Sequence, residues 1–537
     1  MDILSPSFIL SIVGGYFLIL MLIAFWTSKD ADNSDFFVAN RQSPWYLVAF
    51  GMVGASLSGV TFISVPGMVG AVYSNPDVAV AANMQFSYMQ MVFGYLAGYA
   101  VIALVLLPLY YRLNLTSIYT YLEQRFGTAS YKTGAGFFLL SRIVGASFRL
   151  YLVAMVLYLF VFEPWGMPFW TVSLLTILLI WIYTFKGGIK TIVWTDTLQT
   201  TFMLVAVVMT VIQLTSALDI PLTSAWDSIQ AESLGQIFFF EGGWSDPNNF
   251  FKQFLAGMFI AIVMTGLDQD MMQKNLTCRN IGDAQKNMFT FSIVLVFVNF
   301  VFLMLGALLS IYAMREGIDF GRSDNLYPTI ALEHLPWYIG AIFIVGLVAA
   351  AYSSADSALT SLTTSFCVDF LGFKTEKEDG VGKEEEQTKT EWTDEERPFL
   401  TMEEALNDMG VPAPSGELAP EQTRQLVHIG FSLLLFVVIV IFWWINDQSV
   451  VNALFKFAGY TYGPLLGLYS FGLFTTKKVK DALVPMVCIG APVLTYIINI
   501  NSEALLFGYK FGFELLLLNG FLTFIGLLLI SQNEKVQ

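Results

Sequence analysis

Charged residues, cysteines and histidines are scarce in this sequence. Only 13% of the 537 residues are charged, and there are three cysteines and two histidines. A soluble protein of this length would need about twice that charged fraction to cover its surface. Cys278, Cys367 and Cys488 show no disulfide or metal-binding spacing, and His334 and His428 suggest no metal site. The composition thus argues against a soluble domain, a disulfide scaffold and a metal centre built from these residues.

Common enzyme motifs are missing as well. The sequence contains no HExxH, no Gly-x-Ser-x-Gly and no phosphate-binding loop. We therefore expect that the protein is not an enzyme.

Long apolar stretches, in contrast, are abundant. Hydrophobic residues make up 56% of the chain, and its mean hydropathy is +0.64. Apolar runs of about 20 residues predict membrane-spanning helices. The sequence thus predicts an all-α polytopic membrane protein with thirteen transmembrane helices. The predicted spans are 6–27, 45–72, 79–108, 133–163, 167–185, 191–216, 252–273, 288–314, 337–370, 425–445, 450–474, 481–500 and 511–532.

The distribution of basic residues predicts the orientation in the membrane. Cations favour cytoplasmic loops, and here they gather in alternate loops, whereas the segment 217–250 between two spans is acidic. We expect the N-terminus outside and the C-terminus in the cytoplasm, with the protein in the plasma (inner) membrane. The first span lacks a basic start and a cleavage site, so we read it as a permanent helix. The predicted inward loops hold Lys29, Arg41, Arg112, Arg125, Lys132, Lys186, Lys190, Lys274, Arg279, Lys286, Lys477, Lys478 and Lys480.

One polar segment interrupts this pattern. Residues 374–424 contain fifteen Asp/Glu against six Lys/Arg and carry much of the formal net charge of −15. Such a composition is typical of a disordered insertion. We expect a solvated cytoplasmic loop with a short helix at Thr401–Asp408; a regulatory docking role is the alternative.

The second span has an unusual composition for a membrane helix. MVGASLSGVTFISVPGMVG (52–70) mixes hydroxyl residues with four glycines and a proline. Glycine and proline weaken the helical hydrogen-bond ladder, and unwound backbone at membrane depth is tolerated only where it lines a cavity. The alternative is that the small residues only permit close helix packing.

Polar oxygens also occur deep in the ninth span, where Val348–Ser361 reads VAAAYSSADSALTS. Such groups are costly at bilayer depth unless they hold something, and oxygen ligands suit a hard cation such as sodium. Serines in membrane helices often bond back to the preceding turn instead. Together with a broken second span, Ser353 and Ser354 favour a sodium site.

Five ordered segments resemble the sodium:solute symporter family, which includes the sodium/glucose and sodium/sialic acid cotransporters. The entry to the first core helix of this family is similar to Asp35–Gly67, which reads DFFVANRQSPWYLVAFGMVGASLSGVTFISVPG. The inner loop after the second core helix is similar to Tyr111–Gly127, which reads YRLNLTSIYTYLEQRFG. GGIKTIVWTDTLQTTFM resembles the fifth core helix, GLDQDMMQKNLTCRN the inner end of the sixth, and AGYTYGPLLGL the tenth.

The resemblance implies a leucine-transporter-like core of two inverted five-helix repeats, with the first and sixth core helices broken. It implies a sodium ion held by the carbonyls of Gly54, Leu57 and Ala350 and the hydroxyls of Ser353 and Ser354. The implied domains are a peripheral helix (1–30), a first repeat (45–216), a second repeat (250–373 and 425–474) around the acidic loop (374–424), and two peripheral helices with a short tail (479–537).

A second cation site is a further implication. Asp196 resembles the aspartate of family members that have an additional sodium site, whose other ligands fall on Ser353, Asp356 and Ser357. Asp356 departs from the serine expected there. Two close carboxylates share a proton or bind a cation, so a second sodium, a proton or neither remain open, as does local pairing of Asp196 with a lysine such as Lys190.

The solute site is predicted from polar residues within spans. Ser56, Ser58 and Thr61 can line one unwound cavity, and sialic acid transporters of the family have a similar Leu-Ser-x-x-Thr pattern. Arginines in the fourth span can receive a carboxylate, or they can snorkel to the headgroups. The candidates are Ser56, Ser58, Thr61, Gln85, Gln90, Arg142 and Arg149, with Lys456, Tyr460, Phe455 and Phe457 as weaker ones.

We therefore expect sodium-coupled symport of a small polar organic solute by alternating access. A sugar, a sialic acid or another organic anion is expected, with the arginines favouring an anion. Proton coupling is the main alternative, and a transporter-like sensor and a passive channel are lesser ones. Sodium, the solute and the lipid bilayer are the expected partners. No nucleic-acid partner is expected, and the sequence leaves the oligomeric state open, although a monomer is compatible with it.

Overall fold

Helices predominate in the part of the chain that the computed structural model describes. It describes residues 5–27, 39–70, 84–184, 188–373, 420–445, 450–506 and 508–532. The predicted acidic loop, including Thr401–Asp408, falls largely outside the described residues; the description resumes at Pro420, where α20 begins. One short antiparallel strand pair, β1 (Lys478–Val479) with β2 (Ser531–Gln532), joins two segments near the end of the chain.

The helices of the first half alternate between long and short segments. They are α1 (Pro6–Thr27), η1 (Ala39–Arg41), α3 (Trp45–Ser56), α4 (Gly59–Val69), α6 (Tyr88–Val101), η2 (Ile102–Leu106), α7 (Leu107–Arg112), α8 (Thr120–Arg125), α9 (Thr128–Leu157), η3 (Tyr158–Phe162), η4 (Glu163–Trp165), α10 (Phe169–Thr184), α11 (Gly188–Ala217), η5 (Leu222–Ser224), α12 (Ala225–Ala231) and η6 (Gly243–Ser245).

The helices of the second half also differ widely in length. Its helices are α13 (Phe250–Ala261), η7 (Ile262–Gly266), α14 (Gln269–Leu276), α15 (Ile281–Glu316), η8 (Ser323–Asn325), α16 (Leu326–Thr329), η9 (Ile330–His334), α17 (Trp337–Ser365), η10 (Phe366–Phe370), α20 (Pro420–Ile445), α21 (Val450–Thr461), α22 (Gly463–Phe474), η11 (Asp481–Leu483), α23 (Val484–Ile500), α24 (Ser502–Leu505) and α25 (Leu515–Leu529).

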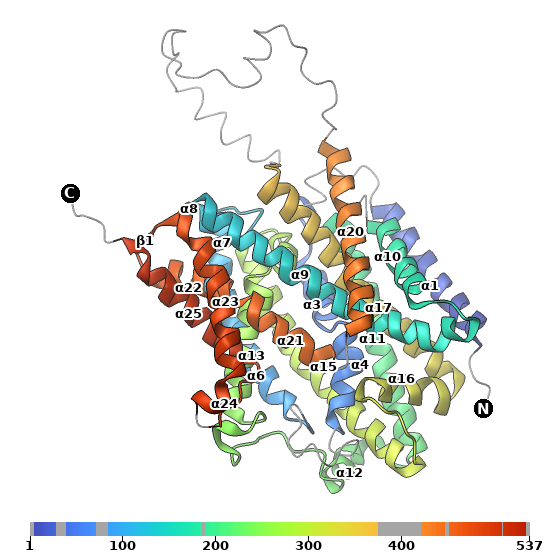
Figure 1. Cartoon of the computed structure of the whole chain (residues 1–537). Helices are drawn as coiled ribbons and strands as arrows, with labels where there is room; N and C mark the ends of the chain where they lie inside the picture. The colour runs from blue at the N-terminus through green and yellow to red at the C-terminus, as the bar shows by residue number, and fades with distance from the viewer. Residues whose placement is uncertain are drawn as a thin grey trace, which may run out of the picture.

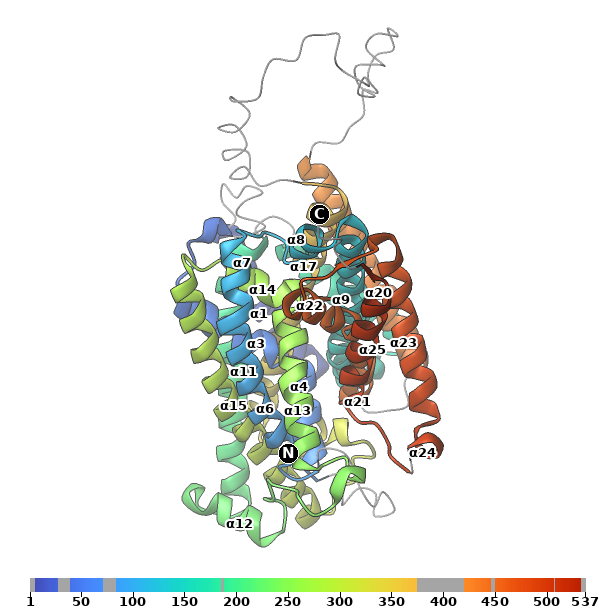
Figure 2. The same ribbon diagram turned by 90° about the vertical axis from the view of Figure 1, so that its left-hand side faces the viewer.

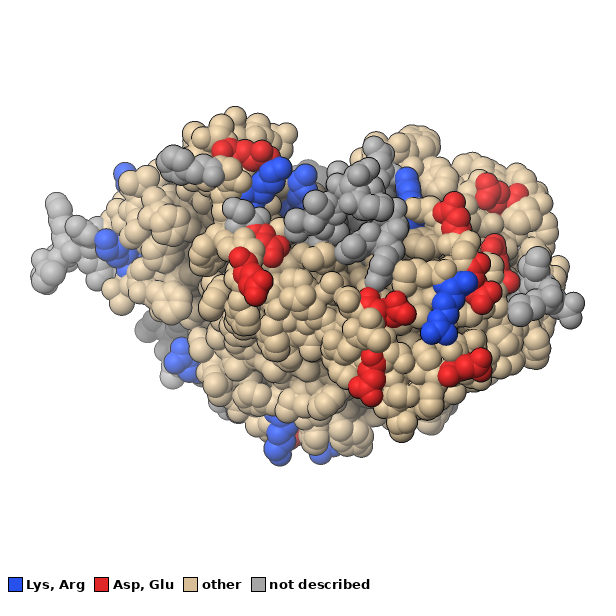
Figure 3. All heavy atoms as spheres, turned by 90° about the horizontal axis from the view of Figure 1, so that it is seen from below, with Lys and Arg blue, Asp and Glu red and all other residues tan. Residues whose placement is uncertain are grey.

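The long helices run between two faces of the molecule. The loops beside α8 lie on one face, and α12 and α24 lie on the other, in both ribbon views (Figures 1 and 2). Figure 1 also shows β1 near the first face. We call the first the basic face, because its loops carry residues such as Arg125, Arg279 and Lys478. The second is the acidic face, where the stretch 217–250 contains no lysine or arginine and acidic side chains are spread over the surface (Figure 3).

Length and composition make the chain a multi-span membrane protein. In the described ranges, eight helices are long and apolar enough to cross a membrane, or ten if each of two bent helix pairs counts as one span. Three shorter apolar helices accompany them: Phe169–Ile182, Gly463–Phe474 and Leu515–Leu529. The class predicted from composition is therefore confirmed.

The first bent pair is the glycine-rich second span. α3 and α4 meet at an angle of 56°, with Leu57 and Ser58 in non-helical backbone conformations between them. Gly54 lies directly against Thr200 of α11, and a Cβ atom at Gly54 would overlap that side chain. Both predicted effects of the small residues therefore occur, since α3 packs closely on α11 and the helix also breaks.

The second bent pair lies in the second half of the chain. α13 with its π-helical extension η7 meets α14 at 64°, and the break falls on Leu267 and Asp268. The Asp268 carboxylate caps α14, because Oδ1 accepts hydrogen bonds from the backbone N–H of Asp270 at 3.0 Å and of Met271 at 3.4 Å. The Asp268 side chain at the break is therefore the N-cap of α14, the second half-helix.

Candidate functional site

A cavity lies beside the first break and the α13–η7 segment. About 780 Å3 of space at this site is not filled by atoms, a figure that includes open solvent, and about 90 Å3 of it can hold the centre of a water molecule. Its walls come from α3, α4, α6, α9, α13 with η7, α14, α15 and α21. The cavity is therefore built from elements of both halves of the chain.

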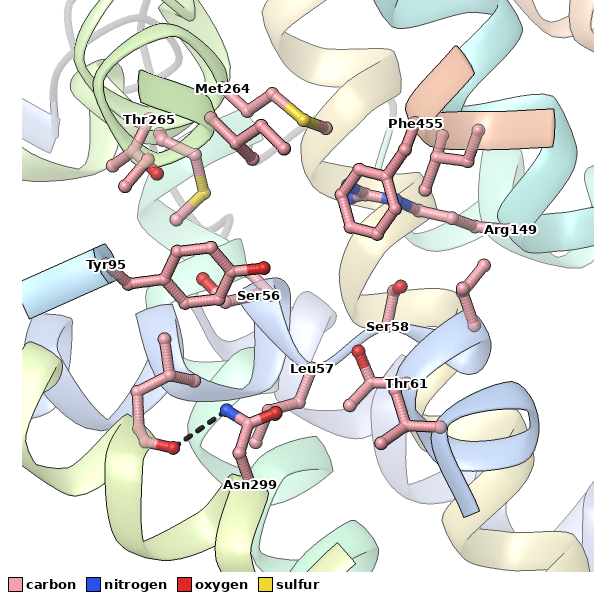
Figure 4. A pocket seen from close by; sticks show the side chains of 18 of the residues that line it. Ser56, Leu57, Ser58, Thr61, Tyr95, Arg149, Met264, Thr265, Asn299 and Phe455 are labelled. Carbon is pink, nitrogen blue, oxygen red and sulfur yellow. Dashed lines mark hydrogen bonds between the residues drawn. The ribbon is translucent and has the colours of Figure 1, made fainter. Parts of the chain in front are cut away.

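Three predicted solute residues share this cavity. Ser56, Ser58 and Thr61 all line it, and they come from the end of α3, the break and the first turn of α4. Figure 4 shows Ser58, Thr61 and Arg149 along one side of the space, with Ser56 and Tyr95 across from them. The broken helix thus presents its hydroxyl groups where a small molecule could bind.

Both predicted arginines also line the cavity, but their partners differ. Arg142 pairs with Asp270, and its Nη1 lies 4.0 Å from Asp268 Oδ2. Arg149 is only 9% exposed, its Nε has no hydrogen-bond partner, and no ion pair among the described residues includes it. Because both guanidinium groups are buried in the bundle, snorkelling to the headgroups does not describe them.

The predicted glutamines lie elsewhere. Gln90 donates from Nε2 to the Asn248 carbonyl at 2.8 Å and accepts at Oε1 from the Phe239 backbone N–H at 3.0 Å. Its amide therefore ties α6 to the segment before α13. Gln85 sits in a turn with φ of 52°, where its backbone N–H donates to Val69. Neither side chain lines the cavity.

The weaker solute-site candidates from α21 also fall into two groups, those that border the cavity region and those that do not. Phe455 lines the cavity, and Phe457 lines a smaller space beside Arg142 and Arg149. Lys456 is exposed, and the Tyr460 hydroxyl accepts a hydrogen bond from Asn499 at 3.0 Å. The aromatic side chains of α21 thus border the cavity, whereas its polar side chains point to other parts of the molecule.

Sequence reasoning missed several cavity residues. Tyr88, Tyr95 and Tyr99 line it from α6, and the first two hydroxyls hydrogen-bond at 3.1 Å. Asn299 lines it from α15, where its Nδ2 donates to the Leu295 carbonyl (Figure 4). The signal was present, because an asparagine within a predicted span and three tyrosines on one helix face are both informative.

The predicted sodium residues meet beside the first break. The Ser354 hydroxyl lies 3.4 Å from the Ala55 carbonyl of α3 and 3.3 Å from the Ala350 carbonyl of its own helix. Gly54 and Leu57, whose carbonyls were predicted as ligands, flank Ala55 within the same turn and its end. The serine of α17 therefore faces the carbonyl end of α3. A sodium ion at this place stays a prediction.

The neighbouring Ser353 has a different partner. Its hydroxyl donates to Asp196 Oδ1 at 2.6 Å, and Lys274 Nζ of α14 contacts Asp196 Oδ2 at 2.6 Å. Asp196 and Lys274 are 1% and 2% exposed in their side chains. Asp196 thus pairs with Lys274, 78 residues further along the chain, and not with a lysine nearby in the sequence. The side chain of Lys190, the local partner that was expected, lies outside the described structure.

The remaining residues of the predicted second cation site make other contacts. The Ser357 hydroxyl donates to Asp270, and Asp356 Oδ1 accepts a hydrogen bond from the Ser357 backbone N–H at 2.5 Å. Both residues are buried. A second cation held by Asp196, Asp356 and Ser357 stays a prediction.

A cluster of charges at the second break is a feature that sequence reasoning did not single out. Asp268 and Asp270 face Arg142 of α9, and the Tyr462 hydroxyl donates to Asp268 Oδ2 at 2.5 Å. In the sequence these aspartates stood out only as part of a family motif. The contacts that explain them come from segments more than a hundred residues away.

Comparisons with known proteins agree on one family. The model of the "Sodium:solute symporter family" matches residues 36–392. A sodium/sialic acid symporter of Aliivibrio fischeri is 25% identical over 356 residues, covering 65% of this chain and 67% of that protein. A sodium/glucose cotransporter of Vibrio parahaemolyticus is 24% identical over 382 residues, covering 66% and 67%.

A solved structure supports the fold independently. The substrate-bound, outward-open structure of a Na+-coupled sialic acid symporter matches with a TM-score of 0.71 and 19% sequence identity, and the match covers 98% of both chains. At this identity the match shows the fold alone. Because the family model covers more than half of the sequence, the chain belongs to the sodium:solute symporter family, and it is a sodium-dependent transporter rather than an enzyme.

Proposed function

We propose that the transported solute is a small organic anion whose carboxylate binds Arg149. Arg149 is the observation that carries this proposal, because it is a buried cation in the cavity wall without an ion pair in the described structure. A guanidinium group binds a carboxylate with two parallel hydrogen bonds. The nearby hydroxyls of Ser58 and Thr61 suit the polar groups of such a solute.

Sialic acids are the first candidates within this class. They combine one carboxylate with hydroxyl and amide groups, which matches one unpaired guanidinium beside hydroxyl and amide side chains. Relatives named as sodium/sialic acid symporters support this choice. Relatives named as sodium-coupled monocarboxylate transporters favour the same charge on a smaller solute.

Sodium is proposed to bind between the end of α3 and the serine pair of α17. The Ser354 hydroxyl and the carbonyls of Ala350 and of the α3 end converge there. The first-helix ligands are proposed to be the carbonyls of Gly54 and Leu57, with Ala55 next to them. Carbonyl and hydroxyl oxygens are ligands of a hard cation, and the broken ends of membrane helices commonly supply them.

The proposed arrangement in the membrane has thirteen spans. It counts each bent pair as one span and adds the three shorter apolar helices to the eight long ones. The broken helices then begin two inverted five-helix repeats, formed by α3–α11 and α13–α22. The protein lies in the plasma (inner) membrane. The acidic face is on the outside and the basic face in the cytoplasm, as the distribution of lysine and arginine favours.

Thermal unfolding of the detergent-solubilised protein tests this proposal. A ligand that binds only the native state raises the unfolding temperature with its occupancy. We expect sialic acid or a short monocarboxylate to raise it in sodium but not in potassium, and glucose to have a smaller effect. The Arg149→Gln variant should lose the response to carboxylates and keep the response to sodium alone.

The matched control is Arg112→Gln, because Arg112 is exposed at the end of α7. This variant should respond as the unmodified protein does. A carboxylate that stabilises Arg149→Gln as strongly as the unmodified protein would overturn the role of Arg149. A neutral sugar that stabilises the protein more than any acid would replace the proposed solute class.

A further inference from the structure

Polar contacts link the half-helix α14 to α17, and two of them include charged side chains, one directly and one through Asp196 of α11. The Ser357 hydroxyl of α17 donates to Asp270. One turn away, Ser353 donates to Asp196, which contacts Lys274. Asp270 precedes Lys274 by four residues, whereas Ser357 follows Ser353 by four. Gln273 of α14 also donates to Thr364 of α17 at 3.1 Å, so α14 follows α17 over more than one contact. We call the contacts through Ser357 and through Ser353 the two rungs.

Each rung also contains an ion pair to a further helix. Asp270 pairs with Arg142 of α9, and Lys274 pairs with Asp196 of α11. The charges alternate, because α14 supplies an anion to one rung and a cation to the other. All four side chains are at most 4% exposed, so water screens these pairs little. We call these six residues the latch: Arg142, Asp196, Asp270, Lys274, Ser353 and Ser357.

The latch holds a short half-helix that follows a break in the chain. α14 has eight residues and follows a 64° break at Leu267 and Asp268. Its other contacts include hydrogen bonds between neutral groups, such as Gln269 Nε2 to the Thr116 carbonyl at 2.8 Å, and the packing of buried apolar side chains such as Met272. In secondary transporters such discontinuous helices form the binding site, around which one bundle of helices rocks or gates against the other.

The latch also touches both proposed ligands. Arg142 lines the cavity, and Ser353 stands beside Ser354 at the proposed sodium site. Because the Ser353 hydroxyl donates its hydrogen bond to Asp196, only the lone pairs of its oxygen can face a cation. A bound sodium ion would polarise this hydroxyl and strengthen its hydrogen bond to the carboxylate.

We propose that the latch closes the basic face of the cavity while sodium is bound, and that Asp270 and Lys274 are its positioning residues. The inference rests on the proposed function, because it takes sodium to bind at the serine pair. Loss of sodium weakens the rung through Ser353. α14 then swings away from α9, α11 and α17 and opens the cavity towards the basic face.

The native cysteines provide a readout that does not depend on transport. Cys278 lies just beyond α14 and is buried; its carbonyl accepts a hydrogen bond from the Tyr111 hydroxyl at 3.1 Å. Cys488 is also buried but belongs to α23. Alkylation by N-ethylmaleimide, followed by peptide mass spectrometry, measures each thiol in the same sample. Cys278 reports movement of α14, and Cys488 reports general unfolding.

In the unmodified protein we expect Cys278 to react slowly in sodium and faster in potassium. Asp270→Asn and Lys274→Gln should react faster in both salts, on the order of tenfold, which is the effect of losing one hydrogen bond to a charged group. Cys488 should stay protected throughout. The control is Lys286→Gln in α15, because Lys286 forms an exposed pair with Asp283, its lysine side chain being 65% exposed.

The outcomes separate the latch from the proposed function. If the variants label at the unmodified rate and keep the sodium effect while Cys488 is protected, the latch is overturned. It is also overturned if sodium raises the unfolding temperature but leaves Cys278 labelling of the unmodified protein unchanged. If sodium changes neither quantity in the unmodified protein, the proposed sodium site fails instead. Where a variant exposes Cys488, Ser357→Ala replaces it, because this change removes only one hydroxyl of the latch.

Discussion

The polar residues around the cavity fall into two regions that differ in how their charges are matched. In the latch, Arg142 faces Asp270 and Lys274 faces Asp196, so each charge has a partner from the protein. In the cavity wall, Arg149 and the hydroxyls of Ser58 and Thr61 border open space. The difference teaches that a buried arginine of this bundle can hold helices together, as Arg142 does, or border the cavity without an ion pair, as Arg149 does. Its partners, rather than its residue type, decide between the two.

Removing one partner from the latch region should have the largest effect. Asp196→Asn leaves the Lys274 ammonium buried without its carboxylate, and breaking a buried pair in this way costs about 3–5 kcal/mol. We expect a marked fall in the thermal unfolding temperature without any ligand. The double variant Asp196→Asn with Lys274→Met should recover much of the loss, as a double-mutant cycle measures. Equal losses in the single and double variants would contradict the pairing.

A substitution at the proposed sodium site should have an effect of intermediate size, and it should act on sodium affinity. Ser354→Ala removes one oxygen ligand, and losing an interaction with a charged group costs about 1.5–3 kcal/mol, so sodium affinity should fall by about tenfold or more. The unfolding temperature without sodium should change little, because the Ser354 hydroxyl has only long contacts with carbonyls. Titration of the unfolding temperature with sodium measures this affinity. An unchanged titration would remove Ser354 from the site.

Removing a neutral hydroxyl from the cavity wall should have the smallest effect of these three changes, and it should act on solute affinity. Thr61→Val removes one neutral hydrogen bond to the solute, worth about 0.5–1.5 kcal/mol, so solute affinity should fall between about twofold and tenfold. Ser64→Ala is the matched control, because Ser64 lies in the same half-helix, is buried, and does not line the cavity. Solute titrations in sodium compare the two variants. An equal loss in both would show that the effect arises from α4 as a whole.

The same comparison explains how far the sequence could predict this molecule. Local patterns were sufficient for the helical membrane class and for the unwound second span, since glycine, proline and hydroxyl residues act on their own backbone. The serine pair of α17 was predicted because hydroxyl groups at bilayer depth are conspicuous. Arg149 and the hydroxyls of α3 and α4 were placed in the cavity for the same reason.

The pairings between distant segments could not be predicted from local patterns. Lys274 resembled a loop cation near the end of a span, and only the fold brings it to Asp196, 78 residues earlier. Gln90 resembled a solute ligand, but its amide is occupied by a segment about 150 residues later. Arg142 and Arg149 were indistinguishable in the sequence, because their difference arises from aspartates on another helix.

Solute uptake into proteoliposomes tests the central claim most directly. Purified protein would be reconstituted, and accumulation of radiolabelled sialic acid would be followed with an inward sodium gradient, an inward potassium gradient, or equal sodium on both sides. The account predicts accumulation above the external concentration only with the inward sodium gradient, and its loss in Arg149→Gln. Equal uptake under all three conditions, or uptake driven by an inward proton gradient without sodium, would contradict it.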